Sequence, residues 1–142
     1  MHAEANRFSR ELSKYFDSFF SEDNLAASYV ELLMILKERG ETGQSELAEA
    51  LHLAPTTITR FLARLEKREW VEKRAEGRAV RASLTSAGSR KVKELEKSYM
   101  LAREGLEQIL GKKYVETLKP LLHHGSELMT AAGLKSEEEA GK

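Results

Sequence analysis

The 142-residue chain contains no cysteine. This absence excludes disulfide bonds, thiolate metal ligands and cysteine-based redox switches. Only two prolines and nine glycines are present, while charged residues make up 32% and apolar residues 41% of the chain. That composition can supply a buried core and favours a helix-rich protein over a β-sandwich or a barrel.

Long hydrophobic runs are also missing. No segment approaches the roughly 18 consecutive apolar residues of a membrane span, and the first residues lack the basic-then-apolar order of a signal peptide. We therefore expect a cytoplasmic protein without a membrane partner. Because the adjacent His123 and His124 would point to different sides of a helix, and no catalytic motif is found, we also expect no metal, no cofactor and no enzymatic activity.

The net charge is zero, but the charges are unevenly distributed. Residues 1–42 have a net charge of −3, residues 43–91 of +4, and residues 92–142 of −1. A basic segment between mildly acidic flanks is typical of a region that contacts phosphates, since only the contacting face needs positive potential.

The spacing of apolar residues predicts a mainly helical fold with six helices and one hairpin. We expect helices over residues 6–20, 25–39, 46–52, 56–69, 86–110 and 112–129, and a hairpin of strands 70–74 and 79–84. Thr85 is expected to cap the long helix, and Pro120 predicts a kink or a late start of the last one. The predicted organisation is an N-terminal helical region over 1–42, a DNA-binding region over 43–91, C-terminal helices over 92–133, and a disordered tail over 134–142.

A helix-turn-helix is predicted from Gln44 onward. Apolar residues occupy the positions where two short crossing helices need a core, and the small Ala48 lies where the helices approach closely. Ser45 is expected to cap the first helix, His52 stands in the turn where glycine is easier, and Pro55 suits the first position of the second helix. The inward positions are Leu47, Leu51, Leu53, Ile58 and Phe61.

The second helix is the candidate reader of DNA, because its hydroxyl and guanidinium groups lie away from its apolar side. Arg78 at the hairpin tip, flanked by two further arginines, is a candidate for the minor groove. The alternative is that these residues are an ordinary solvated surface. The predicted DNA-binding residues are Ser45, Thr56, Thr57, Thr59, Arg60, Arg64, Arg74, Arg78 and Arg81.

Three runs of sequence resemble the multiple-antibiotic-resistance regulator (MarR) family: 44–51 (QSELAEAL), 57–66 (TITRFLARLE) and 71–88, which includes VEKR and LTSAG. The resemblance implies a homodimeric winged helix-turn-helix transcription regulator, usually a repressor of a near-palindromic operator. It places Thr57, Thr59, Arg60 and Arg64 at the major groove and makes Arg78 the wing arginine.

The chain departs from the family pattern at several positions. Glu76 replaces the usual aspartate two residues before the wing arginine, and the wing is short. Ala54 stands where a capping aspartate or serine is common, which removes a cap worth about 1 kcal/mol. Glu69 replaces the glycine that commonly ends the second helix, so its last turn is expected to extend or to be strained.

The flanking helices provide apolar surface for a homodimer, because one winged helix reads only half of an operator. The candidate dimerisation residues are Phe8, Leu12, Tyr15, Phe16, Phe19, Leu110, Val115, Leu118, Leu121 and Leu122; they could instead form the core of a monomer. The resemblance also implies a small-molecule effector, for which Tyr15, Tyr29, Trp70 and Tyr99 are candidate contacts, although aromatic residues at such spacing are more often core.

The sequence thus predicts a sequence-specific regulator that binds double-stranded DNA. Two alternatives remain: a winged helix that binds another protein, and an architectural protein that binds DNA without regard to sequence.

Overall fold

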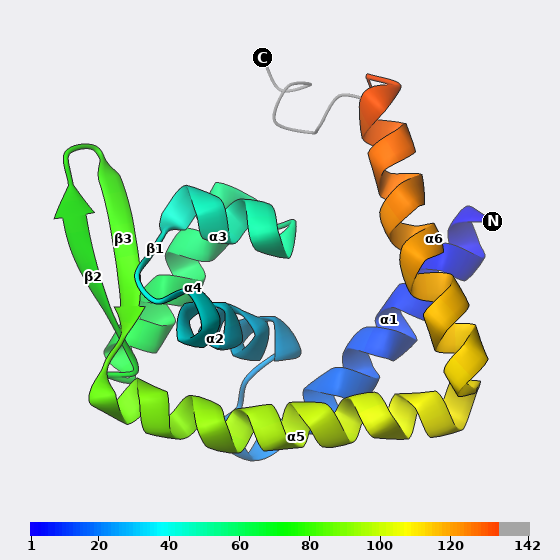
Figure 1. Cartoon of the computed structure of the whole chain (residues 1–142), viewed down its shortest axis with the longest axis horizontal. Helices are drawn as coiled ribbons and strands as arrows, with labels where there is room; N and C mark the ends of the chain where they lie inside the picture. The colour runs from blue at the N-terminus through cyan, green and yellow to red at the C-terminus, as the bar shows by residue number, and fades with distance from the viewer. Residues whose placement is uncertain (134–142) are drawn as a thin grey trace. The chain divides into compact units, whose positions relative to one another are not determined.

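The computed structural model describes residues 1–133; the predicted disordered tail lies outside this range. The chain is mainly helical, with a three-stranded antiparallel sheet (Figure 1), which confirms the predicted fold class. In chain order the elements are α1 (His2–Ser18), the 3-10 helix η1 (Ser21–Asp23), α2 (Ala27–Arg39), β1 (Thr42–Gly43), α3 (Gln44–Leu51), α4 (Pro55–Lys67), β2 (Val71–Glu76), β3 (Ala79–Leu84), α5 (Ser86–Leu110) and α6 (Lys112–Ala131).

Two compact units make up the chain, and the boundary between them falls inside α5. The first unit comprises residues 1–102 and contains the whole buried core. This core takes side chains from α2, α3, α4, β2, β3 and the first half of α5. The winged segment therefore shares its core with the helices on either side of it and has no separate core.

The apolar face of α4 explains why this helix is so firmly placed. Ile58, Leu62 and Leu65 recur at intervals of four and three residues, which puts them on one side of a helix, and all three are fully buried. Leu33 in α2 and Leu47 in α3 are buried in the same cluster. The opposite side of α4 consequently faces away from the core.

The sheet has the strand order β1-β3-β2, with β2 and β3 forming the predicted hairpin. Gly77 in its turn has φ +61°, a conformation that glycine adopts without strain. The short strand β1, which pairs Thr42 with Ala82 and Gly43 with Arg81, was not predicted. Two residues are too few for a recognisable period of alternation.

The ends of the helices test several predictions. The expected cap at Ser45 is wrong. Helix α3 begins at Gln44, one residue before Ser45, and its N-cap is Gly43. Pro55 is the first residue of α4, and Ala54 before it makes no side-chain cap, both as expected. Thr85 accepts a hydrogen bond from the Gly88 N–H (3.0 Å), which confirms it as the cap of α5.

Two non-glycine residues have left-handed backbone conformations at positions where the sequence analysis noted that glycine would be easier or is more common. His52 (φ +55°) ends α3, and Glu69 (φ +64°) follows the end of α4. The predicted strain at Glu69 is therefore confirmed, since such a conformation is costly for a residue with a Cβ.

The second unit begins at Arg103. It contains the end of α5 and all of α6, and none of its residues up to 133 is buried. Pro120 lies inside α6, so the late helix start that it suggested does not occur. No helix within residues 1–133 combines the length and the apolar character needed to cross a membrane.

Candidate nucleic-acid interface

Helices α3 and α4 form the predicted helix-turn-helix. Leu47 and Ala48 are buried against α4, and the left-handed His52 turns the chain between the helices. The Leu53 N–H then donates to the Ala48 carbonyl (3.1 Å). These contacts hold the two helices as one unit and leave the start of α4 exposed.

The face of α4 opposite its apolar side carries the candidate DNA contacts. Thr56, Thr59 and Arg60 are exposed and Thr57 is half-buried. The Arg60 guanidinium lies 3.4 Å from the Thr57 hydroxyl, one turn earlier on the same helix. Since Ala54 brings no capping oxygen, the positive end of this helix dipole is not compensated by a side chain.

Thr59 makes contacts within the unit. Its hydroxyl donates to the Pro55 carbonyl (3.0 Å) and accepts a hydrogen bond from the side-chain amide of Gln44. Gln44 is the first residue of α3, so this bond ties the starts of the two helices together. In the sequence Gln44 only marks the start of the motif; its role in joining the helices was not predicted, because it depends on the crossing of two helices.

Arg64 is tied back to the loop before α2. It donates to the Asn24 carbonyl (2.7 Å), and its guanidinium lies 5.2 Å from the centre of the Tyr29 ring. Arg68, which the sequence analysis did not single out, donates to the Asp23 carbonyl (2.6 Å), and Lys91 pairs with the Asp23 carboxylate (2.7 Å). Arg64 and Arg68 thus anchor the C-terminal end of α4 to residues 23 and 24. Lys91 anchors the start of α5 to the same segment.

Three of the four candidate effector-binding residues, Tyr15, Tyr29 and Trp70, have separate surroundings, while the fourth, Tyr99, packs against Phe16 with 5.4 Å between the ring centres. The Tyr29 ring stacks on Phe61, with 3.8 Å between the ring centres, and the Tyr15 hydroxyl donates to the Ala102 carbonyl (2.8 Å). Trp70 lies beneath the cations of Arg68 and Lys91. Tyr15, Tyr29 and Trp70 make no ring contact with one another, so each is held by neighbours of its own.

Arg74 and Arg81 face each other across the hairpin, and Glu41 binds both. These contacts hold the pKa of the Glu41 carboxyl below its usual value, chiefly through the hydrogen bond from Arg74. Glu76 lies 3.8 Å from Arg74 and 3.6 Å from Arg81. Arg78 makes no ion pair or hydrogen bond with any residue that the structure describes, so Glu76 does not hold this arginine.

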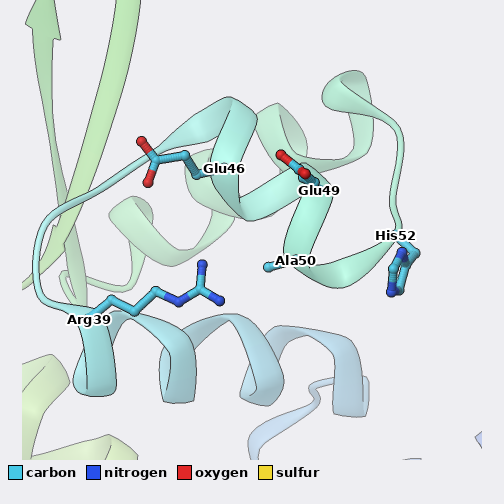
Figure 2. A pocket seen from close by; sticks show the side chains of 5 residues that line it. All are labelled: Arg39, Glu46, Glu49, Ala50 and His52. Carbon is cyan, nitrogen blue, oxygen red and sulfur yellow. The ribbon is translucent and has the colours of Figure 1, made fainter. Parts of the chain in front are cut away.

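A pocket of about 440 Å³ lies between the end of α2 and α3 (Figure 2). Figure 2 shows the Arg39 side chain running beneath α3, with Glu46, Glu49 and His52 placed along that helix. Two carboxylates, one guanidinium and one imidazole do not define a single ligand charge. None of the predicted aromatic contacts lines it, and within residues 1–133 no group of His, Asp and Glu is arranged to hold a metal ion.

The candidate dimerisation residues fall into two environments. In α1, Phe16 packs against the core of the first unit, while Phe8, Leu12 and Tyr15 are half-buried and Phe19 is exposed. In the second unit the residues Leu110, Val115 and Leu118 are half-buried, and Leu121 and Leu122 are 62% and 54% exposed.

Solved structures share this fold. The ligand-free NadR structure aligns with a TM-score of 0.78 over 94% of this chain and 98% of NadR, at 21% identity. NadR in complex with 4-hydroxyphenylacetate aligns with a TM-score of 0.75 over 92% of this chain and 98% of NadR, at 22% identity. A cysteine-to-serine mutant of MarR from E. coli, complexed with operator DNA, aligns with a TM-score of 0.71 over 87% and 91% of the two chains, at 22% identity.

The sequence itself matches one family model. Residues 25–77, from the start of α2 through the helix-turn-helix to the tip of the hairpin, match the model of the MarR family. No curated protein matches the sequence significantly. This segment is therefore similar to the MarR family, and residues 1–133 share their fold with the solved structures named above.

Proposed function

We propose that this chain is a homodimeric transcriptional regulator, acting as a repressor, that reads a near-palindromic operator in double-stranded DNA. The observation that carries this proposal is the division of α4 into two faces. Ile58, Leu62 and Leu65 are fully buried, while Thr56 and Arg60 are exposed. The first residues of the helix are also exposed. A helix held in this way can enter a major groove with its N-terminal residues against the base edges.

Each exposed group has a chemistry suited to one part of the duplex. Arg60 can donate two hydrogen bonds to guanine, and Thr57 can contact a base edge or a thymine methyl group. Thr56 and Ser45 lie in the first turns of their helices, where hydroxyl groups suit phosphates. Arg78 extends from the hairpin tip toward a minor groove.

The structural relatives support the same role. One of them is a MarR mutant complexed with operator DNA, and another is NadR in complex with 4-hydroxyphenylacetate. By analogy, a small-molecule effector relieves repression by this chain, and a second copy supplies the other half-site reader. The exposed leucines of α6 are the surface that this second copy would cover.

The first experiment is selection of bound sequences from a random DNA pool, followed by anisotropy titration of the selected duplex and of a random duplex at fixed salt. We expect the selected sequence to bind at least about 10³-fold more tightly, as specific regulators do. Equal binding to both duplexes would favour the architectural alternative. Absence of binding to either duplex would favour a protein-binding winged helix.

The second experiment replaces the proposed reader, Arg60→Ala. We expect a loss of about 1–3 kcal/mol on the selected operator and relaxed preference at the base pair it contacts. Arg10→Ala is the matched control, because Arg10 is also exposed but lies on α1. Unchanged affinity and preference in Arg60→Ala would remove this residue from the reading face.

A further inference from the structure

The hairpin contains a pair of like charges that needs compensation. Arg74 on β2 and Arg81 on β3 are direct cross-strand partners. Two guanidinium groups placed directly opposite each other destabilise a sheet, because each repels the other across a short distance. An anion close to both is therefore required for this register to be stable.

Glu41 supplies that anion from outside the hairpin. One of its carboxylate oxygens, Oε1, accepts hydrogen bonds from Arg74 Nε (3.2 Å), Arg74 Nη2 (2.5 Å) and Arg81 Nε (3.0 Å). The Glu41 backbone carbonyl accepts a further bond from Arg81 Nη2 (3.1 Å). Charge-assisted bonds of this length are roughly twice as strong as neutral ones.

The segment that carries Glu41 is itself held in place. Gly40 (φ +76°) ends α2 and turns the chain, and the Thr42 hydroxyl donates to the Gly40 carbonyl (2.9 Å). Thr42 is only 1% exposed and pairs with Ala82 of β3. Glu41 therefore projects from a fixed turn at the edge of the sheet.

The two guanidinium charges in the middle of the hairpin are more than balanced. Glu41, Glu46 and Glu76 together surround the two guanidinium groups, with Glu46 lying 3.7 Å from Arg81. This local group has one more negative than positive charge. The tip residue Arg78 lies outside it, since no ion pair or hydrogen bond in the described part of the chain involves Arg78.

We propose that Glu41 is a positioning and specificity residue, which withholds Arg74 and Arg81 from the DNA phosphates and leaves Arg78 as the wing's contact. This inference rests on the proposed DNA binding. It assigns Arg74 and Arg81 to anchoring the wing, in place of the DNA contacts that the sequence predicts for them. Limiting phosphate contacts lowers affinity for random DNA and so favours the operator, because phosphate contacts carry no sequence information.

The test is the salt dependence of binding to a random duplex, measured by anisotropy for the full chain and for Glu41→Gln. Each guanidinium that reaches a phosphate steepens the slope of log K against log salt by about 0.9. We expect Glu41→Gln to steepen the slope by about 1 to 2 and to bind random DNA at least about tenfold more tightly at low salt. The added substitutions Arg74→Gln and Arg81→Gln should return the slope to that of the unmodified chain.

Glu72→Gln is the matched control. Glu72 lies on β2, is exposed, and makes no ion pair within residues 1–133, so this substitution removes the same charge close to the wing without releasing Arg74 or Arg81. If Glu41→Gln changes the slope no more than Glu72→Gln does, the proposal is overturned. It is also overturned if the triple variant stays as steep as Glu41→Gln.

A second measurement needs no substitution that could prevent folding. In NMR spectra of the unmodified chain we expect the Nε–H signals of Arg74 and Arg81 to stay unchanged when random duplex is added, while that of Arg78 shifts. Shifts of all three signals would contradict the role of Glu41. A flat anisotropy titration without any NMR signal shift would contradict the proposed DNA binding itself. In that case, slow solvent exchange of the Arg74 and Arg81 Nε–H groups in the free chain would still support the anchoring by Glu41.

Discussion

The two units of this chain bury their apolar residues to very different extents. Within residues 1–102, leucines such as Leu33 and Leu62 are fully buried in one continuous core. From residue 103 to residue 133 no side chain is buried, and Leu121 and Leu128 are 62% and 58% exposed. The same residue type is thus buried in one unit and largely exposed in the other.

This difference indicates where stability arises and where association is expected. Burying a leucine stabilises a fold by about 1.5–3 kcal/mol, so the first unit has a core that can support its own folding. Exposed leucines repeated along one helix contribute nothing comparable until another surface covers them. The predictions below test this contrast, from the largest effect to the smallest.

The largest effect is expected from Leu62→Ala in the core. Removing this side chain from α4 leaves a cavity, and we expect the free energy of unfolding to fall by about 2–5 kcal/mol at every protein concentration. Urea denaturation measures this loss. Leu121→Ala is the comparison, and its effect should vanish on dilution because Leu121 acts only through a partner in the proposed dimer. Equal, concentration-independent losses would abolish the contrast between the units.

The second prediction concerns association. The paired substitution Leu121→Glu and Leu122→Glu places two charges on the exposed surface of α6, and we expect it to weaken dimerisation more than about tenfold, which corresponds to about 1.4 kcal/mol. Sedimentation or light scattering would then report the mass of one chain. Thr117→Glu, also at an exposed position of α6, is the control. A dimer that survives the double substitution would place its interface elsewhere.

The third prediction tests backbone strain in the first unit. Glu69 has φ +64°, so Glu69→Gly should relieve strain and raise the free energy of unfolding by about 0.5–1 kcal/mol. Ala63→Gly, at an exposed position in the interior of α4, should lower it by about 1 kcal/mol. Thermal unfolding of both variants checks the opposite signs, and a loss of stability in both would show that Glu69 is not strained.

The smallest effect is expected at a carboxyl group. Burial raises the pKa of Glu31 in α2, the negative charge of Asp17 raises it further, and a hydrogen bond from Tyr99 opposes them. A carboxyl whose pKa is raised by folding destabilises the fold above that pKa, and the penalty disappears as the pH falls through it. Glu31→Gln should therefore raise the melting temperature near pH 7 and have progressively less effect in mild acid. A benefit that does not change with pH would show that ionisation of Glu31 is not its cause.

Much of the fold could be predicted because its signals are local. The apolar spacing of α4, the cap at Thr85 and the difficult turn at His52 each depend on a few neighbouring residues. The short strand β1 was not predicted, because Ala82, the pairing partner of Thr42, lies forty residues further along the chain. Asp17 was missed for the same reason, since its carboxylate accepts a hydrogen bond from the N–H of Ala27 at the start of the next helix (2.8 Å).

The candidate DNA interface divides in the same way. Amino-acid order alone predicted the helix-turn-helix, the proposed reading face around Arg60, and the basic hairpin whose tip carries Arg78. Only the tertiary structure decided which of the basic residues are free, because Arg64 is engaged by the loop before α2 and Arg74 and Arg81 by Glu41. The physical reason is that ion pairs and hydrogen bonds act over a few ångströms of space, and folding brings Glu41 to Arg74 and Arg81, which lie 33 and 40 residues away in the chain.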